Sequence, residues 1–140
     1  MPVVDASAVV DVLDPEVPDD APARLLIDKL IASGSELVAP SLLWLEASNV
    51  LLAGIRRGRW DGAAADSAFA LLARMPIRSA DIPADRERAF ELARRYDNWP
   101  VHDMVYIALA ERLRTEFYTA DDRLRARLGH LPWVRGLAET

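Results

Sequence analysis

Two short apolar segments of this chain lie more than a hundred residues apart, and each runs into aspartate. Residues 2–4 lead into Asp5, and residues 117–119 lead, through one alanine, into Asp121 and Asp122. Burying a single carboxylate is costly, and burying several together costs more unless a cation offsets their charge. Acids at the ends of buried segments therefore point to a shared site that binds a cation.

Two further acids lie in or at the start of apolar segments with helical periodicity. Glu46 lies within residues 42–52, and Asn49, three positions later, shares its face of a helix. Asp103 lies near the start of the apolar segment 101–110. Because both segments are apolar enough to be buried, a carboxylate in either is expected to have a partner. Glu46 and Asp103 are therefore further candidates for the cation site, and Asn49 is a secondary one.

Each of these acids also has an ordinary structural interpretation. Asp5, Asp121 and Asp122 could cap the helices that follow them, because aspartate accepts hydrogen bonds from the first free N–H groups of a helix. Asp103 could stabilise the first turn of its helix through the helix dipole. Glu46 could belong to the polar stripe of a surface helix. One acid of this kind is weak evidence for a site, whereas four together are stronger.

The chemistry that four gathered carboxylates would allow follows from their mutual repulsion. At 5 Å and an effective dielectric near 20, each pair repels by about 3 kcal/mol. Either some of the acids are protonated, or a divalent cation offsets the repulsion. The chain has no cysteine, and a site with oxygen ligands alone suits Mg²⁺ or Mn²⁺ rather than structural zinc. Water bound to such a cation could hydrolyse a phosphodiester bond.

The elements that must position these acids alternate between strands and helices. Short apolar segments predict strands at residues 2–5, 37–39, 77–82, 116–119 and 133–134. Helical periodicity and capping residues predict helices at residues 6–13, 23–32, 41–58, 61–75, 85–96, 102–114 and 121–128. This alternation predicts an α/β fold, a three-layer α/β/α sandwich with a mostly parallel central sheet of about five strands. Ligands bind beyond the carboxyl ends of such strands, where Asp5 and Asp121 are expected to meet.

Composition limits the classes of function. The 140 residues fit a single domain spanning 1–140, and the net charge is −5. A net acidic protein is not a typical nucleic-acid binder, so contact with a polyanion would need a local basic rim. Candidate arginines for that rim are Arg56, Arg57, Arg59, Arg94, Arg95 and Arg123. No apolar segment approaches the roughly 20 residues that span a bilayer, and no signal peptide is evident, which predicts a cytoplasmic protein without a membrane partner.

Four motifs together resemble those of the PIN-domain ribonucleases, specifically the VapC-type toxins of prokaryotic toxin–antitoxin pairs. The segments 3–7 (VVDAS), 40–51 (PSLLWLEASNVL), 101–111 (VHDMVYIALAE) and 119–124 (TADDRL) resemble, in order, the four acidic motifs of that family. The resemblance covers the whole chain.

The resemblance carries expectations about site and partners. It implies a parallel five-stranded sheet and a Mg²⁺- or Mn²⁺-dependent endoribonuclease, neutralised by a cognate VapB-type antitoxin and commonly a homodimer. Carried over by position, the catalytic and metal-binding quartet would be Asp5, Glu46, Asp103 and Asp121. Asp122 would act through water, and Ser7 and Thr119 would contact metal-bound water or phosphate.

Three other functions are compatible with acids at strand ends or with this fold. A phosphatase with an aspartyl nucleophile would need an acid two residues after Asp5, where the chain has Ser7, and a receiver domain would need a late lysine, whereas the only lysine is Lys29. A non-catalytic PIN-like module that binds protein or RNA remains as the alternative.

The two apolar helices of residues 41–74 exceed what a small sheet needs to cover it, which favours self-association or antitoxin binding.

Overall fold

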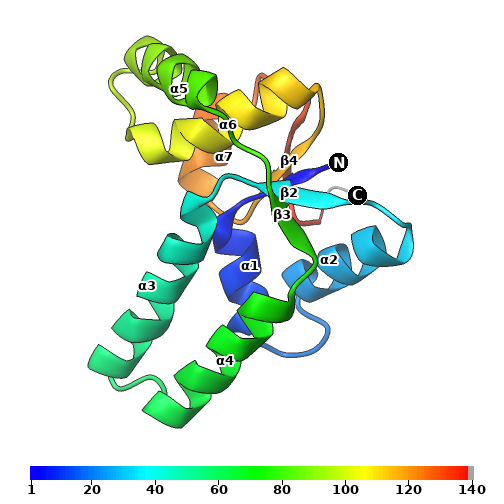
Figure 1. The fold of residues 1–140 in the computed structure, drawn as a ribbon, viewed down its shortest axis with the longest axis vertical. Helices are drawn as coiled ribbons and strands as arrows, with labels where there is room; N and C mark the ends of the chain where they lie inside the picture. Colours follow the sequence, from blue (N-terminus) through cyan, green and yellow to red (C-terminus); the bar gives the residue numbers. More distant parts are fainter. Residues whose placement is uncertain (139–140) are drawn as a thin grey trace.

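The computed structural model describes residues 1–138, in which five strands and seven helices alternate along the chain (Figure 1). In chain order they are β1 (Val3–Val4), α1 (Ala6–Leu13), α2 (Pro22–Ala32), β2 (Leu37–Ala39), α3 (Leu42–Arg56), α4 (Gly62–Arg74), β3 (Ile77–Ser79), α5 (Pro83–Arg95), α6 (Val101–Leu113), β4 (Phe117–Thr119), α7 (Asp122–Leu128) and β5 (Val134–Gly136). All four strand pairings are parallel, in the order β3-β2-β1-β4-β5. The predicted α/β fold with five parallel strands is confirmed.

The direction in which the chain crosses the sheet reverses once. From β1 the chain moves to β2 and then β3, and from β3 it returns across the sheet to β4 and β5. Because such crossovers are right-handed, the two directions place their helices on opposite faces. Figure 1 shows α1–α4 below the strands and α5–α7 above them. The reversal leaves β1 beside β4, and this neighbouring pair is the switch point at which open α/β sheets bind ligands.

The strength of the apolar sequence pattern in each element follows how deeply that element is buried. Both residues of β1 and all residues of β2 and β4 are buried, because helices cover both faces of the central strands. Residues 104–110 of α6 are buried all round, which makes α6 a central helix. In contrast, β3 is an edge strand with Arg78 and Ser79 exposed, and its sequence pattern is correspondingly weaker.

Element boundaries differ from the predicted ones mainly around β3 and α5. The strand ends at Ser79 rather than residue 82, and α5 begins at Pro83 rather than Asp85. Proline is favoured in the first turn of a helix because its missing N–H would be unpaired there anyway. Asp85 then accepts a hydrogen bond from the Ile82 N–H at 3.0 Å, which closes the first turn. Within residues 1–138, no helix is both long and apolar enough to cross a membrane.

Candidate metal and active site

All four predicted acids line one pocket of about 590 Å³ at the carboxyl ends of β1 and β4. Asp5 follows β1, Glu46 lies on α3, Asp103 lies in the first turn of α6, and Asp121 follows β4. The pocket thus draws on four separate segments of the chain at the switch point of the sheet. Ser7 and Asn49, two of the secondary candidates, also line it.

Asp5 is held by two hydroxyl groups. Its Oδ2 accepts hydrogen bonds from Thr119 Oγ1 at 2.6 Å and Ser7 Oγ at 3.0 Å. Asp5 occupies the position before α1 but its side chain makes no cap hydrogen bond, so the capping interpretation does not explain it. The pKa of Asp5 is raised to about 6, chiefly by burial; the hydrogen bonds from Thr119 and Ser7 lower it, and the charges of Asp103 and Glu46 raise it.

Thr119 and Ser7 link the ends of β1 and β4. Thr119, fully buried, also accepts a hydrogen bond from the Asp121 N–H at 2.9 Å. Ser7 Oγ likewise accepts from the Ala120 N–H at 3.0 Å. The two hydroxyls therefore orient the Asp5 carboxylate and fix the turn that carries Asp121. Thr119 does not line the pocket and bears on it only through the residues that it binds, whereas Ser7 lines the pocket directly.

Replacing Thr119 by valine would remove the hydroxyl and preserve the shape of the side chain. The Asp121 N–H would lose its acceptor and Asp5 would lose a donor, so we expect the free energy of unfolding to fall by about 1–3 kcal/mol. The pKa of Asp5 should also rise, because the Thr119 hydrogen bond lowers it. Urea denaturation measures the first effect. Thr119→Ser, which retains the hydroxyl, is the matched control, and an equal loss in both variants would contradict the assignment.

Glu46 is held by a side chain from the other face of the sheet. The Tyr106 hydroxyl, from α6, donates to Glu46 Oε1 at 2.7 Å. Burial raises the pKa of Glu46 and the charge of Asp103 raises it further, whereas the Tyr106 hydrogen bond and His102 lower it. Glu46 is therefore a partnered acid and not part of a solvated stripe.

Asp103 is oriented by the turn that precedes α6. Trp99 Nε1 donates to Asp103 Oδ2 at 2.7 Å, and His102 Nε2 lies 3.5 Å from Asp103 Oδ1. Asp97 and Asn98 both adopt the left-handed region, with φ of 58° and 61°. This region costs energy for residues other than glycine, and Asn and Asp tolerate it best. The turn places Trp99 beside the Asp103 carboxylate, and the Trp99 ring also packs against the core.

Asp121 serves as a helix cap and also lines the pocket. Its Oδ1 accepts hydrogen bonds from the N–H groups of Arg123 and Leu124 at 3.0 and 3.1 Å. The capping interpretation is therefore correct for Asp121, but capping uses only one of its two oxygens. Asp122 lies in the first turn of α7, is exposed, and is not among the residues that line the pocket.

Each acid uses one carboxylate oxygen for positioning. Asp5 Oδ1, Glu46 Oε2 and Asp121 Oδ2 make no hydrogen bond within residues 1–138, and Asp103 Oδ1 contacts only His102. Oxygen atoms of this kind suit a hard divalent cation. However, in the part of the chain that the structure describes, no group of three or more His, Asp or Glu side chains is placed so that it could hold a metal ion. The acids share a pocket but are less tightly gathered than expected.

Asp11 is a pocket residue that sequence reasoning missed. It lies on α1 four residues after Ser7, and both line the pocket. Burial raises the pKa of Asp11, and the charge of Asp14 raises it further. The i, i+4 spacing from Ser7 could have indicated it, because residues four apart share one face of a helix.

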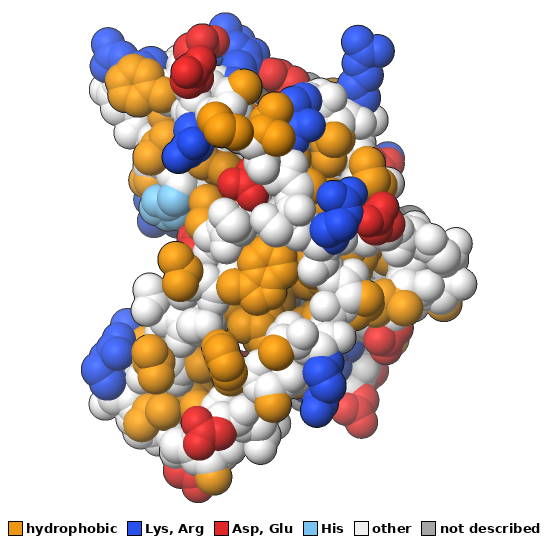
Figure 2. All heavy atoms as spheres, viewed as in Figure 1, with side chains coloured by type: hydrophobic (Ala, Val, Ile, Leu, Met, Phe, Trp, Pro, Cys, Tyr) orange, Lys and Arg blue, Asp and Glu red, His pale blue; other side chains and the backbone are white. Residues whose placement is uncertain are grey.

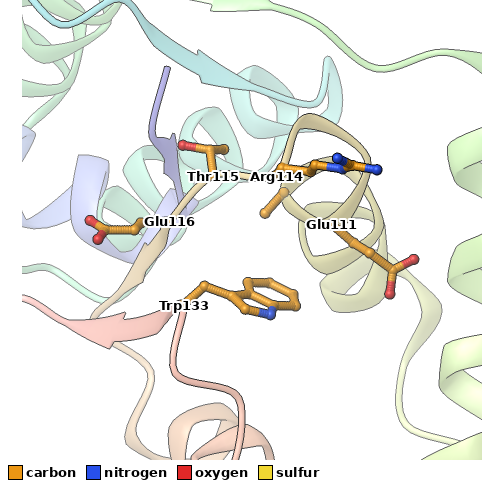
Figure 3. Close-up of a pocket in the computed structure, with 6 residues that line it drawn as sticks. Glu111, Arg114, Thr115, Glu116 and Trp133 are labelled. Atoms are coloured by element: carbon orange, nitrogen blue, oxygen red, sulfur yellow. The ribbon is translucent and has the colours of Figure 1, made fainter.

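A second pocket, of about 560 Å³, opens at the opposite end of the strands, near the start of β4 (Figure 3). Figure 3 shows the ring of Trp133 turned into this pocket, with Glu111 and Glu116 on either side of it. Both acids are already engaged: Arg88 binds Glu111 at 2.7 and 3.0 Å, and Tyr118 and Arg135 bind Glu116. This pocket therefore offers no carboxylate comparable with those at the switch point.

Comparison with known proteins bears on the fold and the family. The sequence pattern that defines the PIN domain matches residues 3–128. Among solved structures, VapC20 of Mycobacterium tuberculosis, described as a toxin that cleaves the sarcin–ricin loop, superimposes with a TM-score of 0.63. The alignment covers 90% of this chain and 94% of that one at 20% sequence identity. No curated protein matches the chain at a significant level.

Proposed function

This chain belongs to the PIN-domain family, and we propose that it is a Mg²⁺- or Mn²⁺-dependent endoribonuclease of the VapC toxin type, acting in the cytoplasm and neutralised by a cognate VapB-type antitoxin. One observation carries the proposal: four acids from four distant segments line a single pocket at the switch point of the sheet. Members of this family are typically nucleases. The similarity to VapC20 in fold supports the toxin assignment.

In the proposed reaction, Asp5, Glu46, Asp103 and Asp121 would hold the cation through the carboxylate oxygens that they do not use for positioning. The bound cation would supply positive charge beside the phosphate and make water more acidic. Glu46 or Asp103 would accept the proton of the water that attacks phosphorus, and as the P–O3′ bond breaks a solvent water would protonate the departing 3′-oxygen. The products would carry a 5′-phosphate and a 3′-hydroxyl.

The secondary residues have supporting roles in this proposal. Ser7 and Thr119 keep Asp5 in one orientation through their hydroxyls. Asn49, on the same face of α3 as Glu46, offers an amide that can donate to a phosphate oxygen. Asp122, exposed beside Asp121, would reach the site only through water.

The direct test is cleavage of RNA by the purified chain. We expect internal cuts in Mg²⁺ or Mn²⁺ that leave 5′-phosphates, and none in excess EDTA. Sequencing the RNA ends after brief expression identifies the cleavage site in the same experiment. Cleavage that persists in EDTA, or ends that carry a 2′,3′-cyclic phosphate, would contradict the mechanism.

The alternative is a non-catalytic PIN-like module that binds protein or RNA. The absence of a preformed group of three ligating side chains among residues 1–138 favours it. A cation titration separates the two functions. If the acids hold Mn²⁺, a concentration about 100 times the dissociation constant should raise the free energy of unfolding by about 2.7 kcal/mol. Thermal denaturation measures this, with EDTA as the reference; no shift at millimolar Mn²⁺ would support the non-catalytic module.

Self-association is proposed from the outer surface of α3 and α4. Leu45, Leu52 and Ile55 form an exposed apolar stripe on α3, with 72%, 51% and 38% of their surface exposed, and Phe69 on α4 is 54% exposed. Figure 2 shows hydrophobic side chains over these two helices. Such a surface fits a homodimer or the antitoxin. Sedimentation should give a dimer that Leu45→Glu dissociates; a monomer at all concentrations would refute the homodimer.

A further inference from the structure

One face of α3 runs from the acidic pocket to the far end of the helix. Glu46, Asn49, Ala53 and Arg57 follow one another at steps of three and four residues, and Val50 lies four residues after Glu46, so the five form one stripe on α3 and its C-terminal cap. This face differs from the exposed apolar stripe that Leu45 begins. The stripe therefore has an acid near one end and an arginine at the other.

A further pocket adjoins the acidic pocket along this stripe. A pocket of about 460 Å³, here called the arginine pocket, is lined by Asn49, Val50, Ala53, Gly54, Arg56, Arg57 and Arg59. Asn49 and Val50 line the acidic pocket as well. The two pockets therefore adjoin along α3, with acids in one and guanidinium groups in the other.

The three arginines of this pocket differ in how they are engaged. Arg59 is paired with Asp14 at 3.1 Å and Glu16 at 3.4 Å. Arg56 and Arg57 are exposed and form no ion pair or side-chain hydrogen bond with any residue in 1–138. In a chain of net charge −5 whose acids engage many of its arginines, two adjacent unpaired cations beside a pocket are available for an anion.

Arginines at the end of a helix can also serve to cap its last carbonyl groups. Here the last carbonyl groups of α3 already accept backbone hydrogen bonds: Arg57 N–H binds Ala53 O, Gly58 N–H binds Ile55 O, and Arg59 N–H binds Gly54 O, at 2.9–3.0 Å. The turn is closed by Gly58 at a φ of 71°. The side chains of Arg56 and Arg57 are therefore not needed as caps.

The wall of the arginine pocket is fixed by a tryptophan. Trp60 Nε1 donates to Leu51 O at 2.9 Å, and the Trp60 ring lies so close to Gly54 that a Cβ there would overlap it. The Arg59 guanidinium lies over the same ring at 4.8 Å. The pocket is thus built on a packed surface, and of its three arginines Arg56 and Arg57 have no side-chain partner within residues 1–138.

We propose that the arginine pocket holds backbone phosphates of single-stranded RNA on one side of the bond that is cut, an inference that rests on the proposed ribonuclease function. At about 1.5 Å per residue, Arg56 lies about 15 Å along α3 from Glu46. A mononucleotide cannot bridge that distance, whereas a strand of several nucleotides can. Figure 2 shows Lys or Arg side chains beside this far end of α3, at the lower left. The guanidinium groups of Arg56 and Arg57 would bind phosphate oxygens, and Asn49 would contact the strand between them and the acids.

The test measures binding rather than cleavage. A labelled single-stranded RNA is titrated with Asp103→Asn protein in Mg²⁺, and fluorescence anisotropy gives the dissociation constant at several salt concentrations. Because each lost phosphate contact reduces the slope of log affinity against log salt by about 0.7, the added pair Arg56→Ala and Arg57→Ala should reduce it by about 1.4. Arg74→Ala, an exposed arginine at the other end of α4, is the matched control and should leave the slope unchanged.

The outcomes separate this inference from the function on which it rests. If wild-type protein cuts RNA but the double variant binds with an unchanged salt slope, the arginine pocket is not a phosphate site, although the ribonuclease function stands. If the wild type does not cut RNA yet the slope falls as expected, the pocket binds RNA and the proposed catalysis is wrong. A fall of about 0.7 in the Arg74→Ala control, half that of the double variant, would also overturn the inference, because it would show a general effect of net charge.

Discussion

Asp103→Asn is expected to reduce RNA cleavage by on the order of a thousandfold while leaving the protein folded. The substitution removes one negative charge and one proton acceptor from the acidic pocket, and general acid–base groups contribute roughly 10²–10⁴ to rate. The fold should survive because asparagine retains an oxygen that can accept the Trp99 Nε1–H bond, now 2.7 Å long. Initial rates on a labelled RNA in Mn²⁺ measure the effect.

The control for this variant is Asp66→Asn, which removes the same charge from an exposed position on α4. Circular dichroism and thermal denaturation should show both variants folded as the wild type is. Near wild-type cleavage by Asp103→Asn would eliminate Asp103 from the site. Equal losses in both variants would show that net charge, rather than the acidic pocket, controls the rate.

Asp5→Asn is expected to make the cation-free protein more stable at neutral pH and to abolish cleavage at the same time. Burial raises the pKa of Asp5 from 3.8 to about 6. Between these pH values the folded state binds more protons than the unfolded state, so this group's contribution to stability falls as pH rises from about 4 to about 6. Above pH 6 the penalty is constant at about 3 kcal/mol. Asparagine cannot ionise and avoids it.

The gain from Asp5→Asn should therefore be up to about 3 kcal/mol at pH 7–8 in EDTA and should vanish near pH 4. Urea denaturation across this pH range measures it, with Asp66→Asn as the exposed control. Added Mn²⁺ should reduce the difference in the free energy of unfolding between Asp5→Asn and the wild type, because only the wild type has the Asp5 carboxylate to hold the ion. If Asp5→Asn is less stable than the wild type at pH 8, ionised Asp5 does not destabilise the folded state.

Local sequence pattern was enough to predict the acids and the elements that carry them. A strand buried on both faces must be a short apolar run, so residues 2–5 and 116–119 could be recognised without knowledge of their neighbours. The carboxylate that ends each run stands out for the same reason. The sequence could not exclude capping for Asp5, because a cap and a site residue occupy the same position before a helix.

The partners of the acids depend on contacts that no local pattern encodes. Thr119 binds Asp5 because the register pairs Val4 with Tyr118, which places the ends of β1 and β4 side by side. Tyr106 reaches Glu46 from the opposite face of the sheet. Asp11 was missed because α1 was recognised from its apolar residues, and only the packed structure shows which of its polar residues face the pocket.

The arginines show the same division. The sequence predicted Arg56, Arg57 and Arg59 as equivalent candidates for a basic rim. In the structure Arg59 forms ion pairs with acids, whereas Arg56 and Arg57 do not. The sequence by itself predicted the fold class and the four candidate acids, because apolar periodicity and isolated charge in an apolar segment are local properties of a chain. Only the tertiary structure decided which oxygens remain unengaged and which cations are available, because hydrogen bonds and ion pairs are fixed by strand register and helix packing between distant residues.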